Sequence, residues 1–219
     1  MDDLKPKNID YGLYLVTDQK LAGANNIVDV VKRAILGGVS VVQYRDKDVD
    51  TGLMIKMAEQ IYEITKSCGV PLIVNDRVDV MMAIDADGVH VGQSDMPARL
   101  VRSLIGPDKI LGVSVKTVDQ AIKAVDDGAD YLGVGDIFGT ATKKDAGLPI
   151  GLDVLRAISA VVKVPIVGIG GINDSNAQDV ILNGADGIAV ISAIVGKNDP
   201  KAAAKKLSSI IKDTKRNKL

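Results

Sequence analysis

Eight short runs of apolar, mostly β-branched residues alternate with amphipathic helical stretches along the whole chain. Most of these runs are almost continuously apolar, which is typical of parallel strands buried on both faces. We expect strands at 13–17, 39–44, 72–75, 88–91, 110–115, 131–134, 166–169 and 187–191. Helical patterns between them include 27–36, 53–66, 118–125, 152–160, 175–182 and 202–212. The alternation predicts βαβ units, and eight strands favour a closed (β/α)8 TIM barrel over a doubly wound sheet.

A recurring joint between helix and strand supports the closed barrel. Segments 87–92, 128–134 and 184–190 each follow a helical stretch and open an apolar run, and 37–42 is a weaker copy. The glycines in these joints suit a helix C-terminus, where a positive φ is favoured. No linker-like segment divides the chain, so we expect one domain over 1–219, with a core at 11–212 and a basic tail at 213–219.

Composition restricts the partners and the compartment. The formal net charge is -1, which gives no reason to expect nucleic acid or an anionic membrane as a partner. Cys68 is the only cysteine, which excludes an intramolecular disulfide and fits a reducing cytosol. The chain has no apolar run near the ~20 residues of a membrane span, so we expect a cytoplasmic protein with small-molecule partners. The sequence leaves open whether the chain forms a homo-oligomer.

Polar residues concentrate where the expected strands end, which is where barrels of this kind carry their chemistry. Gln43, Arg45 and Lys47 have a period of two, so on an extended strand their side chains point the same way. An arginine and a lysine at a barrel rim suit a phosphate or diphosphate. The alternative is a pair of surface salt bridges to Asp46 and Asp48.

Two carboxylates follow adjacent strands. Asp76 and Asp95 end the third and fourth runs and could share one hard cation. Mg²⁺ fits, because it takes few protein oxygens and keeps water and phosphate in its shell. The alternative is that each aspartate caps the helix that follows it.

Anion-binding features also follow the later strands. Thr140, Thr142 and Lys143 lie in a loop flanked by glycines and could cradle an anion. The segments 168–171 and 191–192 come after the seventh and eighth runs, where barrels often bind phosphate. The lone histidine, His90, lies inside an apolar run, so we interpret it as a hydrogen-bonded wall residue and not as a catalytic base.

Several of these segments match one family in order and in strand position. They are YLVTD at 14–18, QYRDK at 43–47, NDR at 75–77, ADGVHVGQSD at 86–95, Ser114, TATK at 140–143, GIGGI at 168–172 and ISAI at 191–194. By these segments, from Tyr14 to Ile194, the chain resembles the thiamine-phosphate synthase family.

The resemblance implies a Mg²⁺-dependent transferase that joins a pyrimidine diphosphate to a thiazole phosphate. It implies that Gln43 contacts the aminopyrimidine, and that the pyrimidine diphosphate is held by Arg45, Lys47, Asn75, Ser114 and Lys143. It implies Asp76 and Asp95 as metal ligands, and a thiazole phosphate site of Thr140, Thr142, Gly171, Ile191 and Ser192. Tyr44, Asp46 and Ala141 lie within the matching segments and are included as substrate-binding residues. The expected catalytic residues are Lys143, Arg45, Lys47 and Ser114.

One stretch departs from the family pattern. Asp136 and Gly139 stand where similar proteins usually carry proline. A carboxylate at this place would weaken anion binding if it pointed inward.

Three other classes of protein are alternatives for this sequence. A thiazole tautomerase would not need the Gln43, Arg45 and Lys47 series or Lys143. A sugar-phosphate isomerase or lyase needs an acid/base pair facing a carbonyl, and the sequence offers no persuasive one. The third alternative, which the sequence leaves open, is a barrel that senses a ligand and catalyses no reaction.

Overall fold

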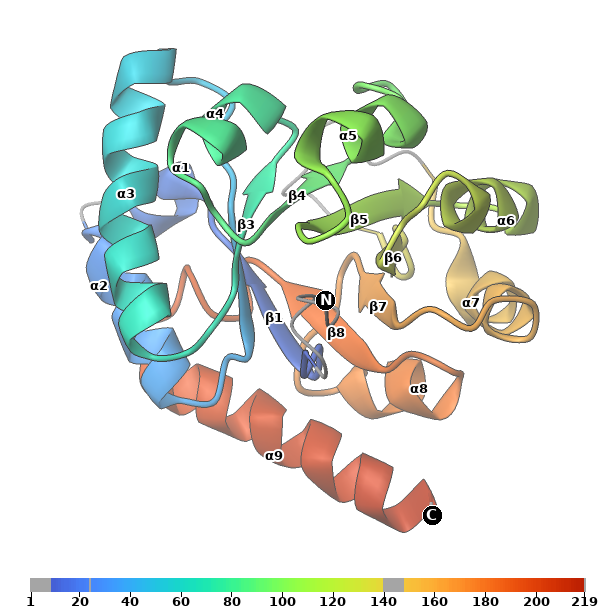
Figure 1. The fold of residues 1–219 in the computed structure, drawn as a ribbon. Helices are drawn as coiled ribbons and strands as arrows, with labels where there is room; N and C mark the ends of the chain where they lie inside the picture. Colours follow the sequence, from blue (N-terminus) through green and yellow to red (C-terminus); the bar gives the residue numbers. More distant parts are fainter. Residues whose placement is uncertain (1–8, 24, 140–147, 219) are drawn as a thin grey trace.

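The computed structural model describes residues 9–23, 25–139 and 148–218. Its eight strands pair in parallel in chain order, and the last pairs with the first, so they form the predicted closed barrel (Figure 1). The strands are β1 (Leu13–Val16), β2 (Val41–Tyr44), β3 (Leu72–Asn75), β4 (Gly88–Val91), β5 (Ile110–Val115), β6 (Tyr131–Val134), β7 (Ile166–Ile169) and β8 (Gly187–Val190).

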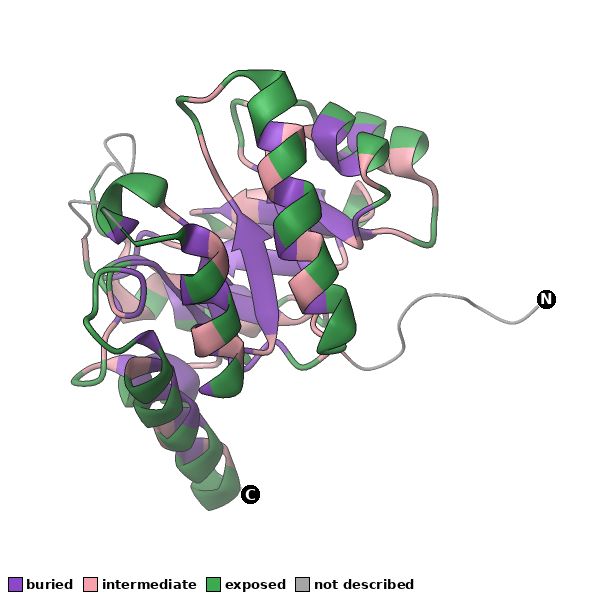
Figure 2. Cartoon of the chain, turned by 90° about the vertical axis from the view of Figure 1, so that its left-hand side faces the viewer, coloured by how far each residue is buried: buried purple, intermediate pink, exposed green. Residues whose placement is uncertain are grey.

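Helices surround the barrel on its outside, as expected of a (β/α)8 fold (Figure 1). Within the described ranges they are α1 (Gln19–Ala22), α2 (Ile27–Leu36), α3 (Thr51–Ser67), α4 (Val78–Ala83), α5 (Ala98–Ile105), α6 (Val118–Asp126), α7 (Gly151–Ser159), α8 (Ala177–Leu182) and α9 (Pro200–Lys218). Figure 2 shows buried strands inside and helices whose outer faces are exposed. None of the helices that the structure describes is long and apolar enough to cross a membrane.

The C-terminal helix is longer than the helical stretch expected at 202–212. The segment expected as a basic tail forms the last turns of α9, which continues to Lys218. Thr214 is buried, and Lys218 Nζ donates a hydrogen bond to the carbonyl of Ile181 at 3.2 Å. The hydrogen bond to Ile181 of α8 attaches the end of the helix to the barrel, and the charge of the segment gave no sign of it.

The recurring joint has a physical role at the N-terminal end of the barrel. The residue just before each even-numbered strand accepts a hydrogen bond from a backbone N–H at the start of the preceding strand. We call these four contacts the basal clasps. They are Ser40 Oγ with Leu13 N (3.1 Å), Asp87 Oδ2 with Leu72 N (2.8 Å), Asp130 Oδ2 with Leu111 N (2.9 Å) and Asp186 Oδ2 with Ile166 N (2.8 Å). In the weaker copy of the joint, at 37–42, the accepting side chain is therefore a serine and not an aspartate.

Removing one clasp is expected to destabilise the fold. Asp130 also accepts from the guanidinium of Arg102, so Asp130→Ala leaves two donors without this acceptor. A buried donor that loses its partner costs about 1–3 kcal/mol, so we expect the melting temperature to fall by about 2–4 °C for each kcal/mol in a chain of this size. Asp153→Ala removes an exposed ion pair with Arg156 and serves as the control. Equal melting temperatures for both variants would contradict the role of the clasp.

Candidate active site

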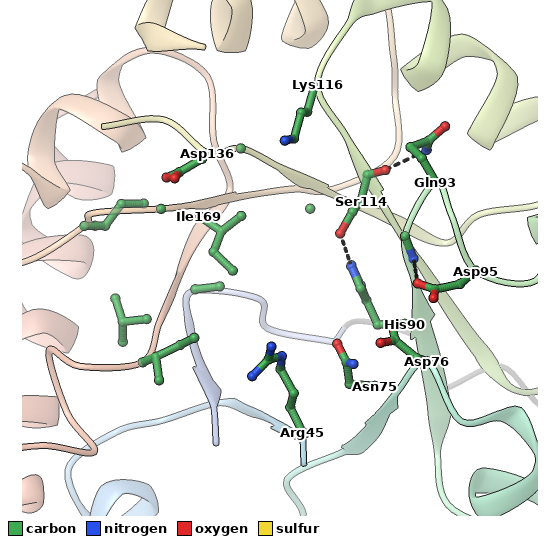
Figure 3. Close-up of a pocket in the computed structure, with 18 of the residues that line it drawn as sticks. Arg45, Asn75, Asp76, His90, Gln93, Asp95, Ser114, Lys116, Asp136 and Ile169 are labelled. Carbon is green, nitrogen blue, oxygen red and sulfur yellow. Dashed lines mark hydrogen bonds between the residues drawn. The ribbon is translucent and has the colours of Figure 1, made fainter. Parts of the chain in front are cut away.

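A cavity of about 310 Å³ opens at the C-terminal ends of the strands, the end opposite the basal clasps. Figure 3 shows the side chains that converge on it. We call it the mouth cavity. The predicted site residues in its lining are Arg45, Lys47, Asn75, Asp76, Asp95, Ser114, Gly171, Ile191 and Ser192. Residues from β2 to β8 and the loops after them thus meet in one place.

The cationic wall of the cavity follows β2. Arg45 is mostly buried, and its guanidinium lies 3.6 Å from the carboxylate of Asp18. Thr17 Oγ1 accepts from the Arg45 backbone N–H at 2.9 Å, which fixes the chain where β2 ends. Lys47 is half exposed, with Nζ 3.7 Å from Asp76 Oδ2. The two partners follow the neighbouring strands, Asp18 after β1 and Asp76 after β3. These two ion pairs are therefore not the alternative pairs with Asp46 and Asp48.

Three residues of the same segment do not line the mouth cavity. Gln43 is buried deeper in the barrel, where its amide donates to the hydroxyl of Tyr14 at 2.9 Å. Tyr44 is buried on the opposite face of β2, as the period of two requires. Asp46 accepts a hydrogen bond from the backbone N–H of Asp48 at 3.1 Å. Their contacts with substrate stay predictions.

Asp76 and Asp95 form a pair of carboxylates at the ends of β3 and β4. Burial, and then the hydrogen bond and charge of Asp95, raise the pKa of Asp76 from 3.8 to about 6, against the opposing charge of Lys47. Neither aspartate caps a helix, because α4 begins after Arg77 and α5 after Pro97, without side-chain caps. The capping alternative is therefore wrong for both.

The pair fits the donor set of a hard cation. Two like charges this close favour a bound cation or a shared proton. Asp95 Oδ2 accepts from the Gly92 N–H at 2.7 Å, which fixes one carboxylate. Among the described residues, no group of three or more candidate ligand side chains occurs. A cation held here would therefore take its other oxygens from water and substrate, as Mg²⁺ does.

The Asp76 carboxylate is expected to make the metal-free protein less stable as pH rises. Its folded-state pKa is raised to about 6, so between about pH 4 and 6 the folded chain keeps a proton that the unfolded chain has lost. Stability should fall across that window and stay low above it. In a chelator, Asp76→Asn should show a smaller fall in melting temperature from pH 4.5 to 7 than the unmodified chain. Asp79→Asn, which changes an exposed carboxylate paired with Arg77, should behave like the unmodified chain. An identical profile for Asp76→Asn would contradict this account.

Several lining residues were not predicted as site residues. Lys116 follows the last residue of β5 and lies two positions after Ser114, so the period of two applied to β2 would have found it. Gln93 donates to the Ser114 carbonyl at 2.7 Å and joins the loop after β4 to β5. His90 is also in the lining, and it is hydrogen-bonded inside the barrel as interpreted.

Asp136 stands at the departure from the family pattern. Its side chain is buried, lines the mouth cavity and lies against Gly170, where a Cβ would collide with the carboxylate. Gly170 has a φ of +103°, so glycine is required there twice over. Both carboxylate oxygens are shielded from solvent against the loop after β7, and a weaker binding of anions stays a prediction. Thr140, Ala141, Thr142 and Lys143 lie outside the described residues.

Comparisons with known proteins agree with this geometry. The model of the thiamine monophosphate synthase family matches residues 13–194. A thiamine-phosphate synthase from Chloroflexus aurantiacus is 55% identical over 211 residues, which cover 96% of this chain and 97% of that protein. One from Roseiflexus sp. is 54% identical and covers 91% of this chain and 84% of that protein.

Solved structures give the same result. Thiamine phosphate pyrophosphorylase from Pyrococcus furiosus has a TM-score of 0.85 and 39% identity, covering 94% of this chain and 98% of its own. A 3-hexulose-6-phosphate synthase has a TM-score of 0.64 at 19% identity, covers 91% of this chain and 99% of its own, and shows a likeness of fold alone. Because the family model and the relatives match most of the chain, this chain belongs to the thiamine monophosphate synthase family and is a transferase enzyme.

Proposed function

We propose that the chain condenses 4-amino-2-methyl-5-(diphosphooxymethyl)pyrimidine with 4-methyl-5-(2-phosphooxyethyl)thiazole, or with the carboxylated tautomer of that thiazole. The products are thiamine phosphate and diphosphate. The observation that carries the proposal is the convergence of Arg45, Lys47 and the Asp76–Asp95 pair on one cavity. Two cations beside two carboxylates suit a diphosphate that arrives with a divalent metal.

The proposed reaction is a dissociative substitution at the methylene carbon of the pyrimidine. The bond from this carbon to the diphosphate oxygen breaks first, and the ring's amino group donates electrons to the cation that results. Arg45 and Lys47 hold the departing oxygens, and we predict the same role for Lys143. Asp76 and Asp95 would hold Mg²⁺, which supplies positive charge against the leaving group.

The opposite side of the cavity suits the second substrate. Gly171 and Ser192 follow β7 and β8, where barrels often bind phosphate. Gly171 has a φ of +66°, and a Cβ there would collide with the carbonyl of Gly139. A phosphate anchored here would hold the thiazole nitrogen close to the pyrimidine cation, replacing a random encounter. That nitrogen carries no proton, so the attack needs no general base.

The test is diphosphate release with both substrates and Mg²⁺ present, and with each omitted in turn. We expect release to require all three. Isomerisation of the thiazole phosphate when it is the only substrate would support a tautomerase. Binding of thiamine phosphate without turnover would support a ligand-sensing barrel. Either of these results would contradict the proposal.

A further inference from the structure

A continuous series of hydrogen bonds crosses the barrel interior beneath the mouth cavity. Gln43 Nε2 donates to Tyr14 Oη at 2.9 Å, and Tyr14 Oη lies 2.7 Å from Tyr131 Oη. Tyr131 Oη lies 2.8 Å from His90 Nδ1, and His90 Nε2 lies 2.8 Å from Ser114 Oγ. The series therefore links the middle of β2 to a side chain that lines the cavity, as Figure 3 shows for its last step.

The tyrosines in the middle of this series are buried. Tyr14 and Tyr131 are each 1% exposed, and the ring of Tyr11 packs on that of Tyr131 with centroids 4.8 Å apart. Two glycines make the space. A Cβ on Gly112 would collide with the Tyr131 hydroxyl and with His90 Nδ1, and one on Gly133 would lie 3.0 Å from His90 Cε1. Because larger residues would close this space, the glycines of β5 and β6 serve the series.

Counting protons gives the series a direction. Gln43 donates to Tyr14, and either hydroxyl of the Tyr14–Tyr131 contact could be its donor. The buried Tyr14 proton has an acceptor in the series when it goes to Tyr131. In that arrangement the proton of Tyr131 goes to His90 Nδ1, which accepts it. A neutral imidazole that accepts at Nδ1 carries its proton on Nε2, and that proton goes to Ser114 Oγ.

We infer that Tyr131 and His90 are positioning residues that present the Ser114 hydroxyl as a hydrogen-bond donor to substrate. With its oxygen accepting from His90, Ser114 keeps its own proton for the cavity. A donor aimed at an anionic group helps most where charge develops during reaction. This role of Ser114 rests on the proposed function. The direction of the hydrogen bonds in the series, which we also call the relay, does not.

The first experiment reads the tautomer directly. His90 is the only histidine, so 15N-histidine labelling of the whole chain gives one imidazole with no assignment ambiguity. We expect a proton on Nε2 and an accepting Nδ1 in the unmodified protein without substrate. In Tyr131→Phe, Nδ1 should lose the signature of an accepted hydrogen bond. A proton on Nδ1 would overturn the inference, because the series would then run the other way and use up the Ser114 proton.

The second experiment tests whether Tyr131 acts through Ser114. Tyr131→Phe should lower kcat by about fivefold to tenfold, the range of one neutral hydrogen bond, with little change in KM. In a Ser114→Ala background the same change should lower kcat less than about twofold, since contacting residues are not additive. Tyr11→Phe keeps the stacked ring and changes no group of the relay, so it should leave kcat unchanged.

The outcomes separate the two claims. An equal loss from Tyr131→Phe in both backgrounds would mean that Tyr131 acts on packing alone, and it would overturn the positioning role. If the chain lacks the proposed activity, the kinetic cycle fails but the tautomer measurement still decides the direction. The tautomer of the unmodified chain also needs no variant, so it decides the matter even where Tyr131→Phe does not fold.

Discussion

Replacing Arg45 with glutamine is expected to lower kcat by about 10²- to 10³-fold. The guanidinium is mostly buried at the rim of the cavity and would face charge that develops on the departing diphosphate. Loss of one fixed donor to such a charge costs about 2.7–4 kcal/mol. Arg45→Lys should recover only part of the rate, because an ammonium keeps the charge but not the planar pair of donors.

The matched control is Lys20→Gln. Lys20 follows β1 on the surface, and it is 77% exposed and paired with Asp48. The substitution Lys20→Gln removes the same charge as Arg45→Gln at a place outside the cavity lining, so kcat should change less than about twofold. Melting temperatures of both variants separate lost chemistry from lost folding. Equal rates for Arg45→Gln and the unmodified chain would remove Arg45 from the mechanism.

Asp76→Asn is expected to raise the Mg²⁺ concentration needed for half-maximal activity by at least about 10-fold, since even the loss of outer-shell partners costs 10–100-fold in metal affinity. Asparagine is the right replacement because Asp76 has a φ of +61°, a conformation that asparagine tolerates and alanine does not. It keeps the shape and removes one of the two charges that would hold the cation.

Asp95→Asn should shift the Mg²⁺ titration in the same direction, because the two carboxylates act on one cation. Asp79→Asn, on the exposed side of α4, should leave the titration unchanged. A normal midpoint in Asp76→Asn would mean that the cation is held elsewhere, and the proposed metal site would be wrong.

The fold could be predicted because its strands are apolar on both faces. The runs at β3 to β7 were predicted at their observed bounds, since a proline, a glycine or a charged residue stands on each side of every one. The helices α1, α4 and α5 were not among the expected stretches. The four residues of α1 are about one turn, which gives little helical periodicity. Asp76 looked like a helix cap because a positive φ at an aspartate leaves no mark in the sequence.

The site was predicted less completely, for a geometric reason. A period of two says which face of a strand a side chain takes, but not its height in the barrel. Gln43 and Arg45 therefore share a face, although one lies deep beside Tyr14 and the other at the mouth. The relay needed contacts between β1, β4 and β6, which no local pattern reveals. Glycines inside apolar strands, as at Gly112 and Gly133, were the available signal.

The basal clasps divide the barrel into four two-stranded quarters, each with its own fastening. The fastenings lie at the floor, so a loop at the opposite opening can change its length or its charge without loosening any of them. Asp136 and Gly139 lie at that opposite opening, away from the clasps. A pair of strands transferred from a related barrel would carry its own clasp, so such pairs are suited to the construction of chimeric barrels.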